Sequence, residues 1–263
     1  MRLKFRGVET NIRTRSITGL WLRHAVSFVR YWKFVLTWVL IEPVVILVAV
    51  GFGVGKLVGT VENDVSYAEF VTPGIILGNA MFHALFETSW NAYNRIENDV
   101  YETALTTPIT ITEITLGDIL WATTRSLLTV IGTGIVAAMF GWLNGWHSIG
   151  ILIPAAMVGV TFGSLGFLFS SVAPHTTFLT LVFTLIASPM FFFSGSFFPI
   201  SILPDWVELV AWGMPLTPAV HIARGFSLGV MDLGHLLAGV YMLALTAVIW
   251  PVAIYLLRRR LIG

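Results

Sequence analysis

Long apolar runs constrain this chain more than any other feature. A helix needs about 20 apolar residues to cross a bilayer. Runs that meet this requirement lie at residues 34–58, 70–92, 116–141, 149–172, 177–198 and 234–257. Only 11% of the 263 residues are charged, about half the fraction of a soluble domain. We therefore predict an all-α membrane protein with six transmembrane helices.

Basic residues gather near the two ends of the sequence. Eight of the 15 Lys and Arg residues precede residue 34, and three more occupy positions 258–260. Positive residues that flank a span stay on the cytoplasmic side. We therefore expect a multi-pass protein of the bacterial inner membrane with both termini in the cytoplasm, which requires an even number of spans. The basic N-terminal segment is too long for a signal peptide.

The chain divides into two predicted units, residues 1–33 and the six-span domain 34–263. The first would be a cytoplasmic N-terminus followed by an amphipathic helix. Its apolar face would consist of Ile17, Trp21, Ala25, Phe28 and Trp32. Arg23 and Arg30 fall on another face, as is typical of a helix that lies in the membrane interface. Packing against a soluble partner is the alternative.

The segment 195–230 interrupts the pattern between the fifth and sixth apolar runs. Its apolar residues are broken by Pro199, Pro204, Pro215 and Pro218. The segment is therefore too broken for a span and too apolar for an ordinary loop. Backbone of this kind at membrane depth must be covered by protein. We expect a re-entrant or interfacial helical hairpin on the outer side, which would serve as a gate or a brace.

Several residues inside the predicted spans are candidates for function, because ionisable groups are costly in lipid. The ionisable candidates are Glu42, His83, Glu87 and Arg125. His83 and Glu87 lie four residues apart, so we expect a hydrogen-bonded pair, with a metal ligand set or a proton relay as alternatives. Arg125 would reach the inner interface by snorkelling. Phe191 and Phe192 would face lipid, or line a pathway by stacking on sugar rings and acyl chains.

The sequence predicts no catalytic centre and no metal site. It contains no cysteine, which excludes disulfides and thiol catalysis. His147, His175, His221 and His235 are scattered over loops and the outer hairpin. The stretch 51–57 resembles a phosphate-binding loop only loosely. Val50 stands where the first glycine of that motif belongs, and Leu57 stands where a Ser or Thr would meet magnesium. We therefore expect a chain that is not an enzyme and binds no cofactor itself.

The stretch 94–118 carries six of the 29 formal charges of the chain and lies between two predicted spans. Residues 97–105 have helical spacing, with Val100, Tyr101, Ala104 and Leu105 on one side. Pro108 should end this helix, and Thr110 or Thr112 should cap the next one. A short charged helix of this kind suits docking on a soluble partner. A solvated connector is the alternative.

Two stretches resemble the ABC-2 type exporter permeases. Residues 101–110, with Glu113 and residues 116–121 after them, resemble the coupling region of that family. Residues 193–199, 203–206, 215–218 and 224–225 resemble its segment after the fifth span. Within the family, residues 66–74 and 121–125 look most like the nodulation-type lipo-oligosaccharide exporter permeases.

This resemblance implies a half-transporter that forms a homodimer and recruits two copies of a separate ABC ATPase subunit, where ATP and Mg²⁺ would bind. The cargo would be a lipid-linked oligosaccharide, a polysaccharide or a similar amphiphile that moves outward. Membrane lipids are a further expected partner, and nucleic acid is not. The residues implied on or next to the ATPase-docking helix are Glu97, Tyr101, Glu102, Leu105 and Pro108. Many family members have Gly-Thr-Leu-Glu here, whereas Val100-Tyr101 precedes Glu102 in this chain.

Three other functions remain as alternatives. A family member could instead export a drug or a hydrophobic peptide. An ion-coupled secondary transporter would use Glu42, Glu87 and Arg125 for proton coupling, but the inverted repeats of many such transporters are missing from the sequence. A membrane enzyme would need a recognisable group of catalytic residues.

Overall fold

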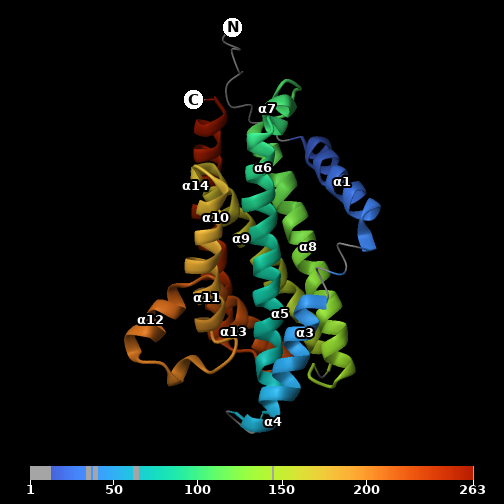
Figure 1. Ribbon diagram of the computed structural model, residues 1–263. Coiled ribbons are helices and arrows are strands. Elements are labelled where there is room, and N and C mark those ends of the chain that lie inside the picture. The colour runs from blue at the N-terminus through green and yellow to red at the C-terminus, as the bar shows by residue number, and fades with distance from the viewer. Residues whose placement is uncertain (1–12, 34–36, 38–40, 62–64, 144, 263) are drawn as a thin grey trace.

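The computed structural model describes residues 13–33, 37, 41–61, 65–143 and 145–262. Within these ranges the regular structure is helical, apart from one isolated β-bridge between Thr60 and Ser66. The long helices run side by side along one common direction (Figure 1). The predicted all-α fold class is therefore confirmed.

In the first half of the chain, the described residues form α-helices that π-helical segments interrupt. In order, these elements are α1 (Thr14–Arg30), α3 (Glu42–Val48), the π-helix η2 (Ala49–Val54), α4 (Gly55–Val58), α5 (Tyr67–Phe86), the π-helix η4 (Glu87–Asn91), α6 (Ala92–Glu97), α7 (Val100–Leu105) and α8 (Ile111–Met139). 

The second half begins with a 3₁₀ turn and ends with the longest helix described. In order, its elements are the 3₁₀ helix η5 (Trp146–Ile151), α9 (Leu152–Val172), α10 (Thr176–Val182), the π-helix η6 (Phe183–Ala187), α11 (Ser188–Phe193), the 3₁₀ helix η7 (Ile200–Ile202), α12 (Asp205–Gly213), α13 (Leu216–Leu228) and α14 (Leu233–Ile262).

Among the described residues, four helical stretches are long and apolar enough to cross a membrane. They are Ile111–Met139, Trp146–Val172, Thr176–Phe193 and Leu233–Ile262. Each corresponds to one predicted span, with ends that differ from the prediction by at most five residues. Of the predicted run 34–58, residues 34–36 and 38–40 lie outside the described residues, and residues 42–58 are helical. The predicted run 70–92 lies within the continuous helical stretch α5–η4–α6.

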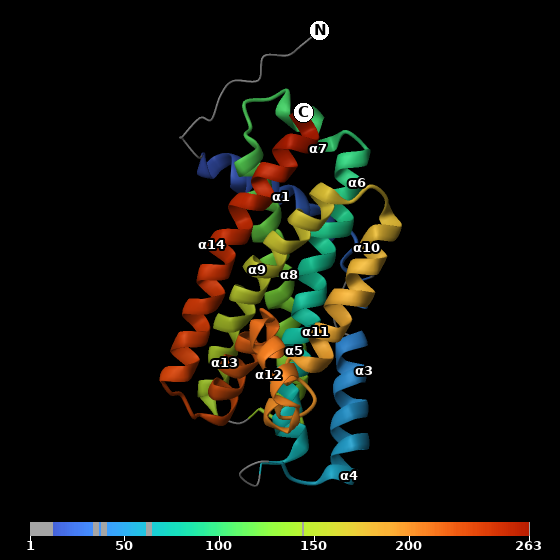
Figure 2. The ribbon, with the colours of Figure 1, turned by 90° about the vertical axis from the view of Figure 1, so that its left-hand side faces the viewer.

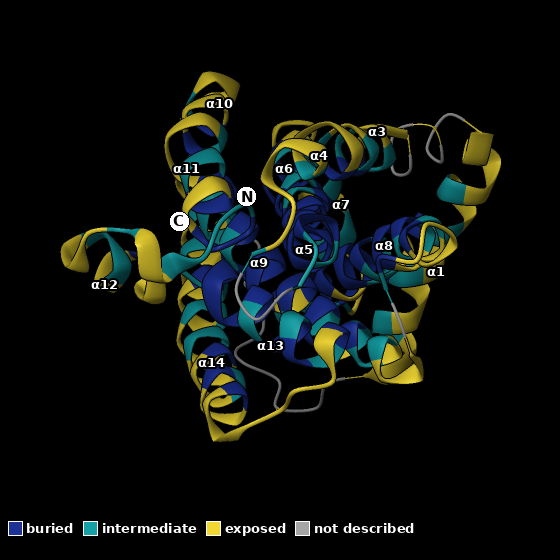
Figure 3. Ribbon diagram, turned by 90° about the horizontal axis from the view of Figure 1, so that it is seen from below, coloured by how far each residue is buried: buried dark blue, intermediate teal, exposed yellow. Residues whose placement is uncertain are grey.

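Helices α5 and α9 form the centre of the molecule. Seventeen of the 20 residues of α5 are buried, and α9 packs against α5, α8 and α14. Figure 3 shows buried residues gathered on α5 and α9. A helix that is covered by protein need not be apolar throughout, which explains why α5 accommodates Asn79 and His83. Gly159 lets α9 pack closely on α8, because a Cβ there would lie 2.6 Å from the Cα of Thr123.

The segment 195–230 folds into η7, α12 and α13. Helix α13 is largely buried and contacts α5, α9 and α14, so this part of the broken segment is covered by protein. Arg224 anchors α13, since its guanidinium lies 3.8 Å from the centre of the Phe70 ring and donates to the carbonyl oxygen of Gly195 at 2.7 Å. By contrast, α12 projects from the side of the bundle and exposes Trp206 and Leu209 (Figures 1 and 2).

Helix α1 packs obliquely across α8 (Figure 1). Leu20 and His24 are buried in this contact, and the rings of Trp21 and Phe28 meet the ring of Trp121 at centroid distances of 6.2 and 5.7 Å. Part of the apolar face that we expected in the membrane interface therefore covers α8 instead. The outward side of α1 exposes both apolar and basic residues, namely Leu22, Arg23, Val26, Val29 and Arg30.

Candidate functional site

The connection from α5 to α8 contains two short helices instead of the single helix predicted over residues 97–105. The break falls at Asn98 and Asp99, between α6 and α7. Asp99 adopts the left-handed conformation with φ of 56°, which Asp tolerates better than most residues. The predicted sides of the helix are confirmed, because Tyr101 is buried and Glu102 is exposed.

Helix α8 begins at a capping box. The Thr110 hydroxyl accepts a hydrogen bond from the Glu113 amide at 3.2 Å, and the Glu113 carboxylate accepts one from the Thr110 amide at 2.9 Å. Thr110, and not Thr112, is therefore the cap. The Glu113 carboxylate also accepts from the amide of Arg13 at 2.7 Å, which ties the start of α1 to the start of α8.

A network of charged side chains lies buried beneath α7, and Glu87 forms one half of it. Glu87 is 2% exposed and opens the π-helix η4, a type of distortion that is frequent at functional sites. Its carboxylate accepts from Arg95 at 2.6 Å, from Arg125 at 2.6 Å and from Asn91 at 2.9 Å. The expected pairing with His83 is thus replaced. Snorkelling of Arg125 is also wrong, because its guanidinium turns inward to Glu87.

Asp118 forms the other half of this network. It is fully buried on α8, and its carboxylate accepts from Arg95 at 3.0 Å and from the Tyr101 hydroxyl at 2.6 Å. Its second oxygen lies 2.6 Å from Nε2 of His24 on α1. Burial, together with the neighbouring Asp118, raises the pKa of Tyr101, so the hydroxyl keeps its proton and remains a donor.

We call these residues the buried charge network: Glu87, Arg95, Asp118, Arg125, His24 and Tyr101. Two carboxylates balance two guanidinium groups, and Arg95 bridges the two carboxylates. Buried charges are tolerated only when they are paired and hydrogen-bonded. The members come from α1, η4, α6, α7 and α8, and Tyr101 links α7 to the others through Asp118.

An acidic surface lies on the outside of this connection. Glu97, Asp99 and Glu102 are exposed. Glu97 pairs with Arg260 at 2.9 Å, and Arg260 also donates to the carbonyl oxygen of Ala173 at 2.7 Å. Figure 2 shows the C-terminal end of α14 beside α7 as a result. 

The implied docking residues take three different positions on this connection. Glu97 and Glu102 are exposed, as is Pro108 beyond the end of α7. Leu105 is half-buried against an apolar cluster beneath α7. Tyr101 is 1% exposed and points to Asp118, so its side chain can support a docking surface but cannot form one.

The remaining candidates inside the predicted spans do not form one site. Glu42 is exposed on α3, and His83 is buried on α5. Phe191 is buried, with its ring 5.5 Å from that of Phe82, whereas Phe192 is half-exposed. Of the six candidates, all within the described residues, only Glu87 and Arg125 form an ion pair with each other.

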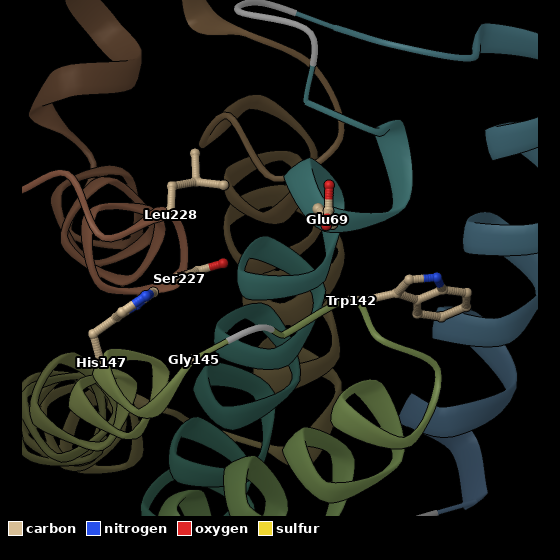
Figure 4. Close-up of a pocket in the computed structure, with 6 residues that line it drawn as sticks. All are labelled: Glu69, Trp142, Gly145, His147, Ser227 and Leu228. Carbon is tan, nitrogen blue, oxygen red and sulfur yellow. The ribbon is translucent and has the colours of Figure 1, made fainter.

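A cavity of about 240 Å³ lies at the end of the bundle opposite α7 (Figure 4). Its lining residues are Glu69, Trp142, Gly145, His147, Ser227 and Leu228. His147 Nδ1 lies 2.6 Å from the carbonyl oxygen of Phe226, which links η5 to α13. The cavity is smaller than the typical range of roughly 300–1,000 Å³ for ligand pockets. A lipid-linked glycan therefore does not fit in it.

Sequence reasoning missed the part that Arg95, Asp118 and His24 play. Arg95 and Asp118 were visible only as charges close to the ends of two predicted spans. His24 was visible as a polar residue among the apolar positions of an amphipathic helix. Arg95 lies 23 residues from Asp118 in the sequence, and His24 lies 94 residues from it. No helical periodicity connects positions that are so far apart.

Comparison with known proteins places this architecture in one family. The family model described as ABC-2 type transporter matches residues 15–228. Nodulation protein J of Rhizobium leguminosarum bv. viciae is 35% identical over 225 residues, which cover 84% of this chain and 86% of that protein. Nodulation protein J of Bradyrhizobium diazoefficiens is 34% identical over 79% of each chain. The inner membrane transport permease YadH of Escherichia coli is 22% identical over 83% of this chain and 84% of its own.

These matches confirm the resemblance that the sequence suggested, both to the family and to its nodulation-type members. They extend over α1, the connection that carries α7, and α13. The chain belongs to the ABC-2 type transporter family.

Proposed function

We propose that this chain is the permease subunit of an ATP-driven exporter in the bacterial inner membrane. In this proposal six helices cross the membrane, the stretches 34–58 and 70–92 in addition to the four apolar helices. The connection with α7 and both chain ends then lie on the cytoplasmic side. The cluster of basic residues at positions 258–260, at the end of the last span, supports this orientation.

The buried charge network is the observation that carries the proposal. The network is a set of side chains, linked by ion pairs and hydrogen bonds, that lies under the short helix α7. The outer surface of α7 is acidic and exposed. An ATPase subunit that docks on Glu97, Glu102 and Pro108 would therefore push on a helix that is coupled to α1, η4 and α8. A solvated connector would need neither the buried ion pairs nor the double link through Arg95.

The cargo that we propose is a lipid-linked oligosaccharide or a similar amphiphile. The identity of 35% to nodulation protein J, and the resemblance of residues 66–74 and 121–125 to lipo-oligosaccharide permeases, support this cargo class. A drug or a hydrophobic peptide is the alternative cargo within the same family.

A homodimer with two ATPase subunits would provide the pathway. The cavity of about 240 Å³ within one chain is too small for such a cargo, which favours a path between two copies. Glu42 on α3 is exposed in the single chain, and a carboxylate within a span needs a partner or water. 

An ion-coupled mechanism is less well supported by the geometry. Proton coupling would require carboxylates that exchange protons during the cycle. Glu87 is instead held by two guanidinium groups at 2.6 Å each, which favours its charged form throughout.

Purification of the detergent-solubilised protein from its native membrane tests the proposal. We expect a nucleotide-binding subunit to co-purify, with ATP hydrolysis that responds to lipid-linked oligosaccharides more than to hydrophobic drugs. Glu102→Lys should reduce co-purification and export at least tenfold, because it reverses an exposed charge without touching the core. Glu208→Lys on α12, at the other end of the bundle, is the control. A chain that purifies without an ATPase, and transport that survives ATP depletion but not an uncoupler, would contradict the proposal.

A further inference from the structure

Two histidines that are distant in sequence meet an aspartate at the junction of α13 and α14. His221 lies on α13, Asp232 lies in the connection, and His235 lies in the first turn of α14. One donor atom from each residue lies within 4.8 Å of one donor atom from each of the others. The junction is at the end of the molecule opposite α7 (Figure 1).

Helix capping explains part of this arrangement. The Asp232 carboxylate accepts from the His235 amide at 3.1 Å, and the Asp232 amide donates to Nδ1 of His235 at 3.1 Å. These two bonds stabilise the start of α14. Capping does not explain why the His221 ring is stacked on the His235 ring, with centroids 4.1 Å apart and planes 6° from parallel.

The donor set has the chemistry of a transition-metal site. Two imidazole nitrogens and one carboxylate oxygen are the ligands of many Zn²⁺ sites, which keep a fourth position for water. A neutral imidazole ring has a lone pair that can bind such an ion. Arg224, on the same helix as His221, binds the Gly195 carbonyl oxygen and the Phe70 ring.

We propose that His221, Asp232 and His235 form a Zn²⁺ site that fastens α13 to α14 at the end of the bundle opposite α7.

The surrounding residues leave room for this site. Gly234 follows Asp232 by two residues, and a Cβ there would lie 3.1 Å from Oδ1 of Asp232 and 3.6 Å from Nε2 of His221. The absence of a side chain at Gly234 thus leaves these two donor atoms accessible from the same side. Nε2 of His235 faces Gly225 instead, which leaves Nδ1 as the donor atom of His235 that faces Asp232.

Metal binding requires a small adjustment of the rings. Ligand atoms of a tetrahedral Zn²⁺ ion lie about 3.3 Å apart, given bonds of about 2.0–2.1 Å. Nδ1 of His235 and Oδ1 of Asp232 lie 2.5 Å apart and have to separate, and Nδ1 has to release the Asp232 amide. Donor atoms that lie as far as 4.8 Å apart have to converge by about 1.5 Å at most, and the parallel rings have to tilt. Asp232 is exposed and His221 is half-exposed, so both side chains can turn without disturbing the core.

A bound ion would add a link between two helices that already pack against each other. Helix α13 is the covered helix of the segment 195–230, and α14 is the last apolar helix that can cross a membrane. A metal bridge between them would fix the angle at which the chain leaves α13. The ion is therefore structural in this proposal, and the site has no part in ATP-driven transport.

Equilibrium dialysis of the purified full chain against ZnCl₂ tests the site, with the affinity tag free of histidine and the metal measured by mass spectrometry. We expect one Zn²⁺ per chain and a thermal unfolding midpoint that rises with Zn²⁺ concentration. The variants His221→Ala and His235→Ala should weaken binding at least tenfold. The control variant His175→Ala changes an exposed histidine that follows the C-terminal end of α9, and it should bind Zn²⁺ as the wild type does.

Two further measurements test the site even if the histidine variants fail to fold. Asp232→Asn keeps the size of an exposed side chain and should still weaken Zn²⁺ binding. Co²⁺ added to the wild-type protein should give the visible absorption of a four-coordinate ion, and Zn²⁺ should abolish it. The absence of stoichiometric Zn²⁺ binding by the wild-type protein, or binding that persists equally in His221→Ala and His175→Ala, would overturn the proposal and leave the three residues as a helix cap.

Discussion

The two ends of the helical bundle are held together by different chemistry. At the α7 end, side chains of opposite charge bind one another, and each carboxylate of the buried charge network accepts from several helices. At the α13 end, the contacts of Arg224 include the backbone carbonyl oxygens of Gly195 and Phe70 and the Phe70 ring. A side-chain network changes whenever one of its helices moves, whereas an arginine bound to backbone holds a helix in place. The first end is thus suited to transmit motion, and the second to brace the bundle.

Removal of Asp118 should have the largest effect. Asp118→Ala leaves Arg95, Tyr101 and His24 without their shared acceptor, and the loss of one partner of a buried ion pair costs about 3–5 kcal/mol. Chemical unfolding in detergent, followed by tryptophan fluorescence, measures the change. Asp205→Ala, an exposed aspartate on α12, is the matched control. Equal losses from both variants would remove the contrast between the two ends.

Arg224→Ala should have the next largest effect, on the other end. It removes the bond to the Gly195 carbonyl oxygen and the stacking on Phe70, which together we put at about 2–3 kcal/mol. Arg224→Lys should recover only part of this loss, because an ammonium group cannot stack as a planar guanidinium does. The same unfolding measurement applies. Full recovery with lysine would show that charge alone matters at this end.

Tyr101→Phe should have a smaller effect than either. It removes one hydroxyl that donates to Asp118 at 2.6 Å, while Arg95 and His24 still bind that carboxylate. A hydrogen bond to a charged group is worth about 1.5–3 kcal/mol, and we expect a loss near the lower limit. ATP-dependent export should fall by a larger factor than the loss of stability alone would cause, because α7 loses its hydrogen bond to α8. A variant that exports as well as the wild type would argue against transmission through this link.

The pair of Glu97 and Arg260 should show the smallest effect, with an informative asymmetry. Glu97 is exposed, so Glu97→Ala should cost less than about 1 kcal/mol. Arg260→Ala should cost more, because Arg260 also donates to the carbonyl oxygens of Ser170 and Ala173. Comparison of the two single variants with the double variant separates these contributions. Equal losses from both single variants would mean that the ion pair dominates.

The sequence predicted the long helices well because their signals are local. Apolar length placed the four apolar helices within a few residues, and Pro108 and Thr110 placed the boundary between α7 and α8. The break at Asp99 escaped prediction, since a single left-handed residue leaves no periodic signal. Part of the apolar face of α1 covers α8, which composition alone does not distinguish from lipid contact.

The sequence predicted where the candidate site lies along the chain, but not which side chains bind one another there. The charges of residues 94–118 marked the connection, but their partners depend on tertiary packing. Arg125 turns inward because Glu87 lies across the helix interface, and Tyr101 is a buried donor because Asp118 lies beneath it. The histidines near the α13–α14 junction looked scattered for the same reason, since His221 and His235 meet only when the two helices are folded against each other.

The central claim is that a partner ATPase docks on the exposed side of α7. Because the chain has no cysteine, single cysteines can be introduced without background. Glu102→Cys on α7 and Leu209→Cys on α12 are both exposed positions, at opposite ends of the bundle. A thiol-attached photo-crosslinker in native membranes should join the ATPase subunit to position 102 and not to position 209. Crosslinking at position 209 instead, or none at position 102 above background, would contradict the account.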